Sequence, residues 1–228
     1  MSDIFPKWTN RLPVYVIVGA LLTGTAVTAG IWYYFTPKYT RVGFMPKQPV
    51  AFSHAIHAGQ LGLDCRYCHS HVEKSWYSNV PATATCINCH GPNNGGILKD
   101  DPRLELVRQS ADPVNGKPIP WKQVHKVPDY VFFNHAVHVN RGVSCKECHG
   151  DVQTMDEVWH AKPLSMAFCL DCHRNPESRV RPLEEVTNLG WKWSDDPKIA
   201  ADKQKAFGKE FVANAKIHAS QNCSACHR

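Results

Sequence analysis

The chain has 228 residues, of which 43% are hydrophobic, and its formal net charge is +6. The length allows one or two domains, but the composition argues against an ordinary protein built on a hydrophobic core, because all ten cysteines follow one repeated pattern. The modest positive charge does not single out a nucleic-acid-binding protein.

The first predicted element is an apolar segment near the N-terminus. Residues 13–35 contain no charged side chain, and 23 residues are enough to cross a bilayer core as a helix. Trp8 precedes the segment and an aromatic run from Trp32 to Phe35 closes it, as is typical of the two membrane interfaces. A cleaved signal peptide is the alternative, but its apolar core is usually shorter. We therefore predict a transmembrane helix at 13–35, preceded by a short segment, 1–12.

Two later stretches of the chain resemble each other at an interval of about 80 residues. The first reads VAFSHAIHAGQLGLDCRYCH and continues to CINCH, and the second reads VFFNHAVHVNRGVSCKECH and continues to CLDCH. The repeat aligns Phe52 with Phe133 and one His-x-x-His pair with the other. A connector rich in proline and glycine separates the copies, and a helix from about Pro197 to Ala219 is predicted before the final motif, CSACH.

All ten cysteines belong to five copies of Cys-x-x-Cys-His. On a helical turn, residues i, i+3 and i+4 share one face, so two thiols can bond the vinyl groups of one porphyrin while the imidazole reaches its iron. The pattern therefore predicts five covalently bound haems c. The predicted attachment residues are Cys65, Cys68, Cys86, Cys89, Cys145, Cys148, Cys169, Cys172, Cys223 and Cys226, with the iron ligands His69, His90, His149, His173 and His227.

Three other uses of cysteine explain this pattern less well. Structural zinc sites take Cys-x-x-Cys pairs two at a time and do not require the trailing histidine. A disulfide scaffold gives no reason for one constant spacing, and a thioredoxin-like redox site needs one such pair rather than five.

Haem attachment also predicts the architecture and the compartment. Fewer than about 40 extramembrane residues are available for each haem, so porphyrins must supply much of the apolar interior. We expect a mostly α-helical and irregular fold: one transmembrane helix and a loop-rich domain of short helices. Haem c is attached outside the cytoplasm, which predicts a single-pass protein of the bacterial inner membrane with 1–12 in the cytoplasm and 36–228 in the periplasm. Within that domain we expect a two-haem repeat at about 48–91, a connector at 92–130 and a three-haem module at about 131–228.

Five irons need five further axial ligands, and eight histidines lie outside the motifs. The pairs His54/His57 and His135/His138 are the best candidates, because each pair can serve two neighbouring irons from one helical turn. His71, His125 and His218 stay open as alternatives.

These segments resemble the class III multihaem cytochromes, which place Phe-x-His-x-x-His just before a Cys-x-x-Cys-His. The resemblance implies that the first histidine serves the next haem and the second serves another, and that a histidine between two motifs serves a third. It implies the ligand pairs His54 with His69, His57 with His90, His135 with His149, His138 with His173, and His160 with His227. Met166 departs from this pattern, since a thioether ligand in place of one histidine would raise that haem's potential; a methionine packed against porphyrin is the alternative.

Over nearly its whole length the chain looks like the membrane-anchored pentahaem subunit of alternative complex III, a bacterial quinol-oxidising assembly. The likeness rests on the anchor, PIPWKQVHKVPDYVFFNHAVHV, SMAFCLDCHRNP and the terminal CSACHR. It implies an electron-transfer subunit that is no enzyme by itself, with polytopic quinone-binding subunits, a periplasmic iron–sulfur subunit and a monohaem cytochrome c as partners and no nucleic acid.

Two other functions explain the sequence less well. A stand-alone quinol dehydrogenase that feeds a periplasmic reductase has a similar anchor, but usually places its first haem motif close to the membrane helix. Catalysis at a haem needs an iron with an open distal position, and the surplus of histidines argues against one.

Overall fold

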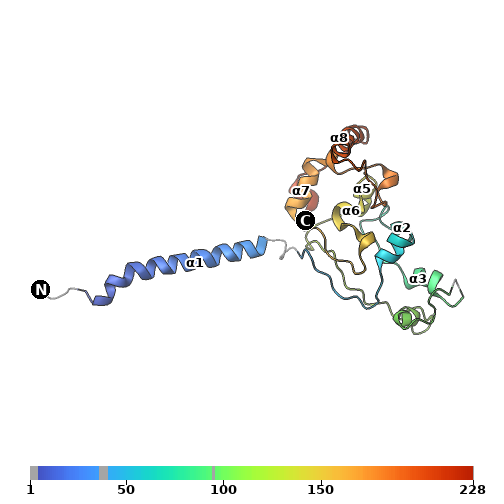
Figure 1. Ribbon diagram of the computed structural model, residues 1–228, viewed down its shortest axis with the longest axis horizontal. Coiled ribbons are helices and arrows are strands. Elements are labelled where there is room, and N and C mark those ends of the chain that lie inside the picture. The colour runs from blue at the N-terminus through green and yellow to red at the C-terminus, as the bar shows by residue number, and fades with distance from the viewer. Residues whose placement is uncertain (1–4, 36–40, 94–95, 228) are drawn as a thin grey trace. The chain divides into compact units, whose positions relative to one another are not determined.

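The computed structural model describes residues 5–35, 41–93 and 96–227, and the chain divides into two compact units between Val42 and Gly43. The predicted segment 1–12 and the predicted domain start at 36 fall partly outside the described residues. Within those residues the fold is helical and irregular, without strands, as predicted (Figure 1). Two isolated antiparallel bridges join Val131 to His227 and Val143 to Val180.

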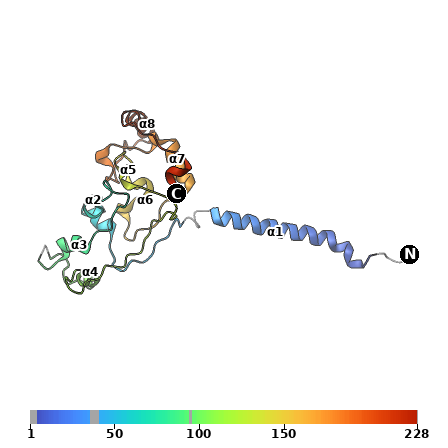
Figure 2. The ribbon, with the colours of Figure 1, turned by 180° about the vertical axis from the view of Figure 1, so that it is seen from behind.

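The helices are short, with two exceptions, and long loops connect them (Figures 1 and 2). Their bounds are α1 Leu12–Phe35, α2 Cys65–Cys68, α3 Thr83–His90, α4 Glu105–Ser110, α5 His135–Val139, α6 Cys145–His149, α7 Met166–Arg174, α8 Pro197–Asn214 and α9 Cys223–Cys226. Single 3-10 turns lie at η1 Lys7–Arg11, η3 Pro102–Leu104, η4 Val152–Thr154, η5 Pro176–Ser178 and η6 Leu183–Glu185, and a π-helical turn lies at η2 Ala55–Gln60.

The first unit consists of α1 and the turn that precedes it. Together they span Lys7–Phe35, which is long and apolar enough to cross a membrane by length and composition. The side chains of this helix are exposed along its whole length. The predicted helix is confirmed, and its apolar surface needs lipid or another protein to cover it.

The second unit has a small apolar core. One cluster joins Val50, Val107 and Ile119, and Trp121 packs against it. Another joins three valines, Val72, Val139 and Val186. These clusters are small for a unit of this length, in keeping with an interior that depends on bound groups for its apolar contacts.

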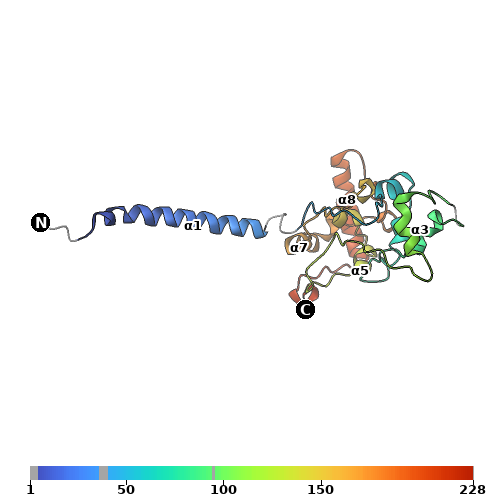
Figure 3. The ribbon, with the colours of Figure 1, turned by 90° about the horizontal axis from the view of Figure 1, so that it is seen from below.

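The last long helix, α8, ends five residues earlier than predicted, at Asn214 (Figure 3). Lys216 adopts a left-handed conformation with φ +47°, and the backbone N–H of Ile217 bonds to the carbonyl of Val212 at 3.0 Å. This is a Schellman ending, which satisfies carbonyls that the helix would leave free. The helix packs on η5 through Gly208, where a Cβ would overlap the Glu177 carbonyl.

Candidate functional site

The two cysteines of each Cys-x-x-Cys-His motif lie on a short helix, namely α2, α3, α6, α7 or α9, as predicted. His69 and His227 are the residues that follow α2 and α9. Three of these helices begin at a residue whose side chain accepts a backbone N–H: Asp64 from Arg66, Ser144 from Lys146, and Ser165 from Phe168. Helices of four to nine residues are not stable alone, so tertiary contacts must hold them. All ten cysteines have free thiols.

Backbone carbonyls orient three of the motif imidazoles. The Nδ1 of His69 lies 2.6 Å from the carbonyl of Asn79, and that of His90 lies 2.7 Å from the carbonyl of Ile97. His173 makes the same contact, at 2.6 Å, with the carbonyl of Ser220. Because a carbonyl only accepts, Nδ1 carries the proton and Nε2 keeps its lone pair, which is the usual arrangement of a metal-binding histidine.

The two His-x-x-His pairs have nearly the same local geometry. In the first copy, the ring of Phe52 lies edge-on to His54, with centroids 4.9 Å apart, and stacks on His57 at 4.3 Å. In the second copy, Phe133 meets the two corresponding imidazoles at 4.8 Å and 4.6 Å with the same orientations. The internal repeat in the sequence is therefore a repeat in structure.

Carbonyls also fix the Nδ1 atoms of histidines in these pairs. The Nδ1 of His57 bonds to the carbonyl of Ser53 at 2.8 Å, and that of His138 bonds to the carbonyl of Asn134 at 2.8 Å. His135 bonds to a distant carbonyl, that of Trp76, also at 2.8 Å. These three imidazoles also present Nε2 as the atom available to a metal.

Three of these imidazoles lie opposite motif imidazoles, with nearly the same distance between ring centroids in each pair. If each metal–nitrogen bond is about 2 Å and each nitrogen is about 1.1 Å from its ring centroid, two imidazoles on opposite sides of one iron would have centroids about 6.2 Å apart. The observed centroid separations are 6.2 Å for His57 and His90, 6.4 Å for His135 and His149, and 6.2 Å for His138 and His173.

His54 lies close to His69, which is the partner that the resemblance implies. Burial, with smaller contributions from the nearby His69 and His57, lowers the pKa of His54 to about 4. His54 is therefore a neutral imidazole at pH 7, the form that binds metals. Its Nδ1 is buried and has no hydrogen-bond partner.

A further group of imidazoles lies around His149. Burial lowers the pKa of His149 to about 3, and the neighbouring His125 and His135 contribute. The His125 ring lies 4.3 Å from that of His149, nearly perpendicular to it, and 5.1 Å from that of His160, which is completely buried. Burial lowers the pKa of His125 to about 4, and its Nε2 has no hydrogen-bond partner.

The alternative ligands thus differ in their surroundings. His71 and His218 are exposed, and Met166, the first residue of α7, is 64% exposed. His125 is the alternative that the structure places among the predicted ligands. Its place in the site was not predictable, because His125 is a lone histidine in a proline-rich connector.

The fifth motif lies against the end of the connector. The N–H of Phe132 bonds to the carbonyl of Cys226 at 2.8 Å, and the ring of Tyr130 lies 5.6 Å from that of His227. The ring contacts of His160 described above are with His125, so the pairing of His160 with His227 stays a prediction.

The motifs follow one another in space in the order second, first, third, fourth, fifth. Burial is the main reason that the pKa values of Cys68, Cys148 and Cys169 are raised, and a cysteine of the neighbouring motif adds to each. The largest cause of the raised pKa of Cys145 is a hydrogen bond with Cys65. The cysteines that meet along this order are Cys86 and Cys68, Cys65 and Cys145, Cys148 and Cys172, and Cys169 and Cys226.

Polar contacts link neighbouring motifs at each step of this order, either directly or through one intervening residue or segment. Asn88 of the second motif donates to the Tyr67 hydroxyl of the first at 3.1 Å. One short segment contacts the capping residues of two helices: Thr187 donates to Asp64 before α2, and the Val186 carbonyl accepts from Ser144 before α6.

Polar contacts also link the third motif to the fourth and the fourth motif to the fifth. Arg179 binds acidic residues of the third and fourth motifs, Glu147 and Asp171. The contact of His173 with the Ser220 carbonyl ties the fourth motif to the segment just before the fifth.

The side chains present fit c-type haem. Free thiols occur at every motif, three of the motif imidazoles are oriented by carbonyls, and neutral imidazoles with low pKa values, His54 and His125, lie near them. Within the described residues, no group of three or more His, Cys, Asp or Glu side chains is arranged to hold a bare metal ion. A haem iron does not need such a group, because the porphyrin supplies four of its ligands.

The sequence matches known proteins in two ways. The family model for cytochrome c7 and related cytochromes c matches residues 131–228. The multihaem cytochrome c subunit of menaquinone reductase from Nitratidesulfovibrio vulgaris is 30% identical over 171 residues, which cover 66% of this chain and 77% of that protein.

Proposed function

Because the chain belongs to the multihaem cytochromes c, we propose that it relays single electrons through five covalently bound haems as a subunit of a membrane quinone oxidoreductase. The observation that carries the proposal is the set of three imidazole pairs at 6.2–6.4 Å, placed along one continuous series of attachment motifs. Each haem iron, when bound, supplies the one-electron exchange between its ferric and ferrous states.

We propose that the cysteines of each motif hold one haem and that its histidine is one axial ligand. The second ligands are His54, His57, His135, His138 and His160, paired with His69, His90, His149, His173 and His227 respectively. The separations of three pairs and the closeness of His54 to His69 support four of these assignments. Two strong nitrogen ligands on each iron leave no position for a substrate, which favours electron transfer over bond chemistry.

The protein's own contribution is to hold these sites in series. The motif cysteines meet in neighbouring pairs, and hydrogen bonds or ion pairs link neighbouring motifs directly or through an intervening residue or segment. An arrangement with two ends suits a relay, with the second motif at one end and the fifth at the other. We propose three parts for the domain: the two-haem repeat at about 48–91, the connector at 92–130 and the three-haem module at about 131–228.

We further propose that α1 anchors the chain in the bacterial inner membrane, with the haem domain on the periplasmic side. The partners would be those of alternative complex III: polytopic quinone-binding subunits, an iron–sulfur subunit and a monohaem cytochrome c. Electrons would then pass from quinol towards a periplasmic cytochrome or a terminal oxidase. The anchor and the whole-chain likeness support this assignment.

In a second candidate function, electrons flow in the opposite direction, from the haems to the quinone. The relative from Nitratidesulfovibrio vulgaris is a subunit of a menaquinone reductase, so electrons in that protein's complex go to the quinone. The same series of sites serves either direction, because the direction depends on the donor and acceptor at its two ends. A stand-alone quinol dehydrogenase is the third possibility and needs none of these partner subunits.

Purification in mild detergent separates these functions. Co-purifying quinone-binding and iron–sulfur subunits would support a large complex, whereas the chain alone with quinol-dependent haem reduction would support a stand-alone dehydrogenase. Addition of quinol to the oxidised complex, and of menaquinone to the reduced complex, then decides the direction from the haem absorbance. Haems that respond to neither quinol nor quinone would contradict both directions.

A further inference from the structure

Arg179 connects the third and fourth motifs directly. Its Nη1 lies 3.3 Å from Oε2 of Glu147, which stands between the two cysteines of the third motif on α6. Its Nη2 lies 2.8 Å from Oδ2 of Asp171, which holds the equivalent place in the fourth motif on α7. One guanidinium thus binds two motif helices at once, a geometry that suits its planar set of donors.

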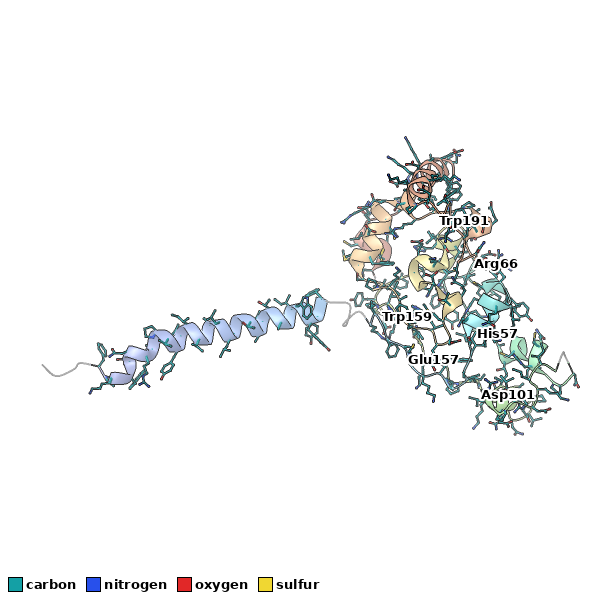
Figure 4. All side chains as sticks on the ribbon, viewed as in Figure 1. His57, Arg66, Asp101, Glu157, Trp159 and Trp191 are labelled. Carbon is teal, nitrogen blue, oxygen red and sulfur yellow. The ribbon has the colours of Figure 1, made fainter. Side chains whose placement is uncertain are left out.

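A second arginine supports this contact. Arg181 is 8% exposed, and its Nη2 lies 3.7 Å from Oε1 of Glu147. It donates to the carbonyl of Asn188 at 3.2 Å, and its guanidinium lies 5.4 Å from the ring centroid of Trp191. Figure 4 labels Trp191. The two arginines therefore balance the two carboxylates, Glu147 and Asp171.

The backbone holds these arginines in place. Arg181 donates its N–H to the carbonyl of Gly142 at 2.9 Å, and Val180 bridges to Val143, two residues before α6. Gly142 has φ +78°, and a Cβ there would also overlap the Arg181 carbonyl. The segment that carries Arg179 is thus fastened to the turn that leads into the third motif.

The charge of Arg179 lies beside both attachment sites. Its guanidinium contacts Glu147, the residue before Cys148, and Asp171, the residue before Cys172. A fixed positive charge therefore lies next to one cysteine of each of the two motifs.

We propose that Arg179 is a positioning residue that fixes the spacing of the third and fourth haems and raises the reduction potentials of both, an inference that rests on the proposed function. Oxidation adds one positive charge to a haem, so a fixed cation nearby disfavours the oxidised state. Without Arg179, the carboxylates of Glu147 and Asp171 outnumber the remaining cation and favour oxidation.

The test is a spectroscopic redox titration of the full-length protein at low ionic strength, where charges are least screened. In Arg179→Gln we expect two of the five reduction potentials to fall by at least about 28 mV. For one electron, this shift corresponds to a threefold increase in the oxidised-to-reduced ratio at a fixed potential. Arg179→Lys keeps the charge but cannot bridge both carboxylates, so it should restore most of the potential. Arg103→Gln is the matched control, because the exposed Arg103 pairs with Asp101 and its loss changes the net charge equally.

Each result bears on the inference. Five unchanged potentials in Arg179→Gln, in protein that carries five haems by mass, would overturn it and leave the proposed function intact. Equal shifts in the Gln and Lys variants would also overturn it, since the charge would then have no part. Wild-type protein with fewer than five haems would overturn the proposed function itself.

Discussion

The rings of His135 and His149 face one another with centroids 6.4 Å apart and planes only 7° apart. They come from two helices, α5 and α6, and the Nδ1 of His135 is held by the carbonyl of Trp76, 59 residues away in sequence. That carbonyl belongs to the loop after the first motif. The contact thus makes the histidine of one repeat depend on the chain of the other.

The second histidine of each His-x-x-His pair should be required for six-coordinate iron at another motif. Replacing His138 with Ala should leave all covalent attachments intact but open the iron bound by His173 to carbon monoxide. His57→Ala should do the same for the iron of His90. Carbon monoxide difference spectra of the reduced protein measure this effect, and the exposed His71→Ala is the control. A variant of His57 or His138 that binds no carbon monoxide would show that the replaced side chain is not a ligand.

His125 and His160 stack on each other, so comparing their variants tests which of them binds iron. We expect His160→Ala to create one high-spin iron and His125→Ala to keep all irons low-spin, because His125 lies perpendicular to His149 at 4.3 Å rather than opposite it. Electron paramagnetic resonance of the oxidised protein distinguishes the two spin states. A high-spin signal from His125→Ala alone would transfer the ligand role to His125.

Ser144 should contribute more to stability than an ordinary helix cap. It is 1% exposed, and its hydroxyl donates to the carbonyl of Val186 at 2.8 Å while accepting the N–H of Lys146. Ser144→Ala leaves a buried carbonyl without a donor, so we expect the free energy of unfolding to fall by about 1–3 kcal/mol. Denaturant titration of the holoprotein measures the loss, and Ser165→Ala, which removes a cap on α7, should cost about 1 kcal/mol. Equal losses would indicate that the contact with Val186 adds nothing.

The anchor should be separable from the haem domain. A protein that lacks residues 13–35 and carries a cleavable signal should be soluble and fully loaded with haem, because the second unit has its own contacts. It should no longer accumulate with membrane partners. Cell fractionation with haem staining is the measurement, and truncated protein that stays on membranes at high salt would show that other contacts suffice.

Local patterns predicted much of the fold. The uncharged run 13–35 predicted α1 because hydrophobicity and length are properties of the segment itself. The repeated Phe-x-His-x-x-His segment predicted matching local structures, since Phe52 and Phe133 contact histidines only two and five residues away. The end of α8 was misplaced because the left-handed residue there is Lys216, not the glycine that usually marks such an ending.

Contacts between distant segments were not predictable in the same way. The order of the motifs, with the first beside the third, arises where Cys65 meets Cys145, 80 residues apart. The bridge made by Arg179 depends on carboxylates at the variable positions inside two motifs, Glu147 and Asp171, whose pairing no spacing rule indicates. The burial of His125 likewise depends on how the connector folds back onto His149.

The number of covalently bound haems tests the central claim most directly. Intact-mass measurement of the purified protein should give the mass of the polypeptide plus five haems, all of which should survive acid–acetone extraction. A smaller number of haems after extraction, or zinc in the purified protein, would contradict the account.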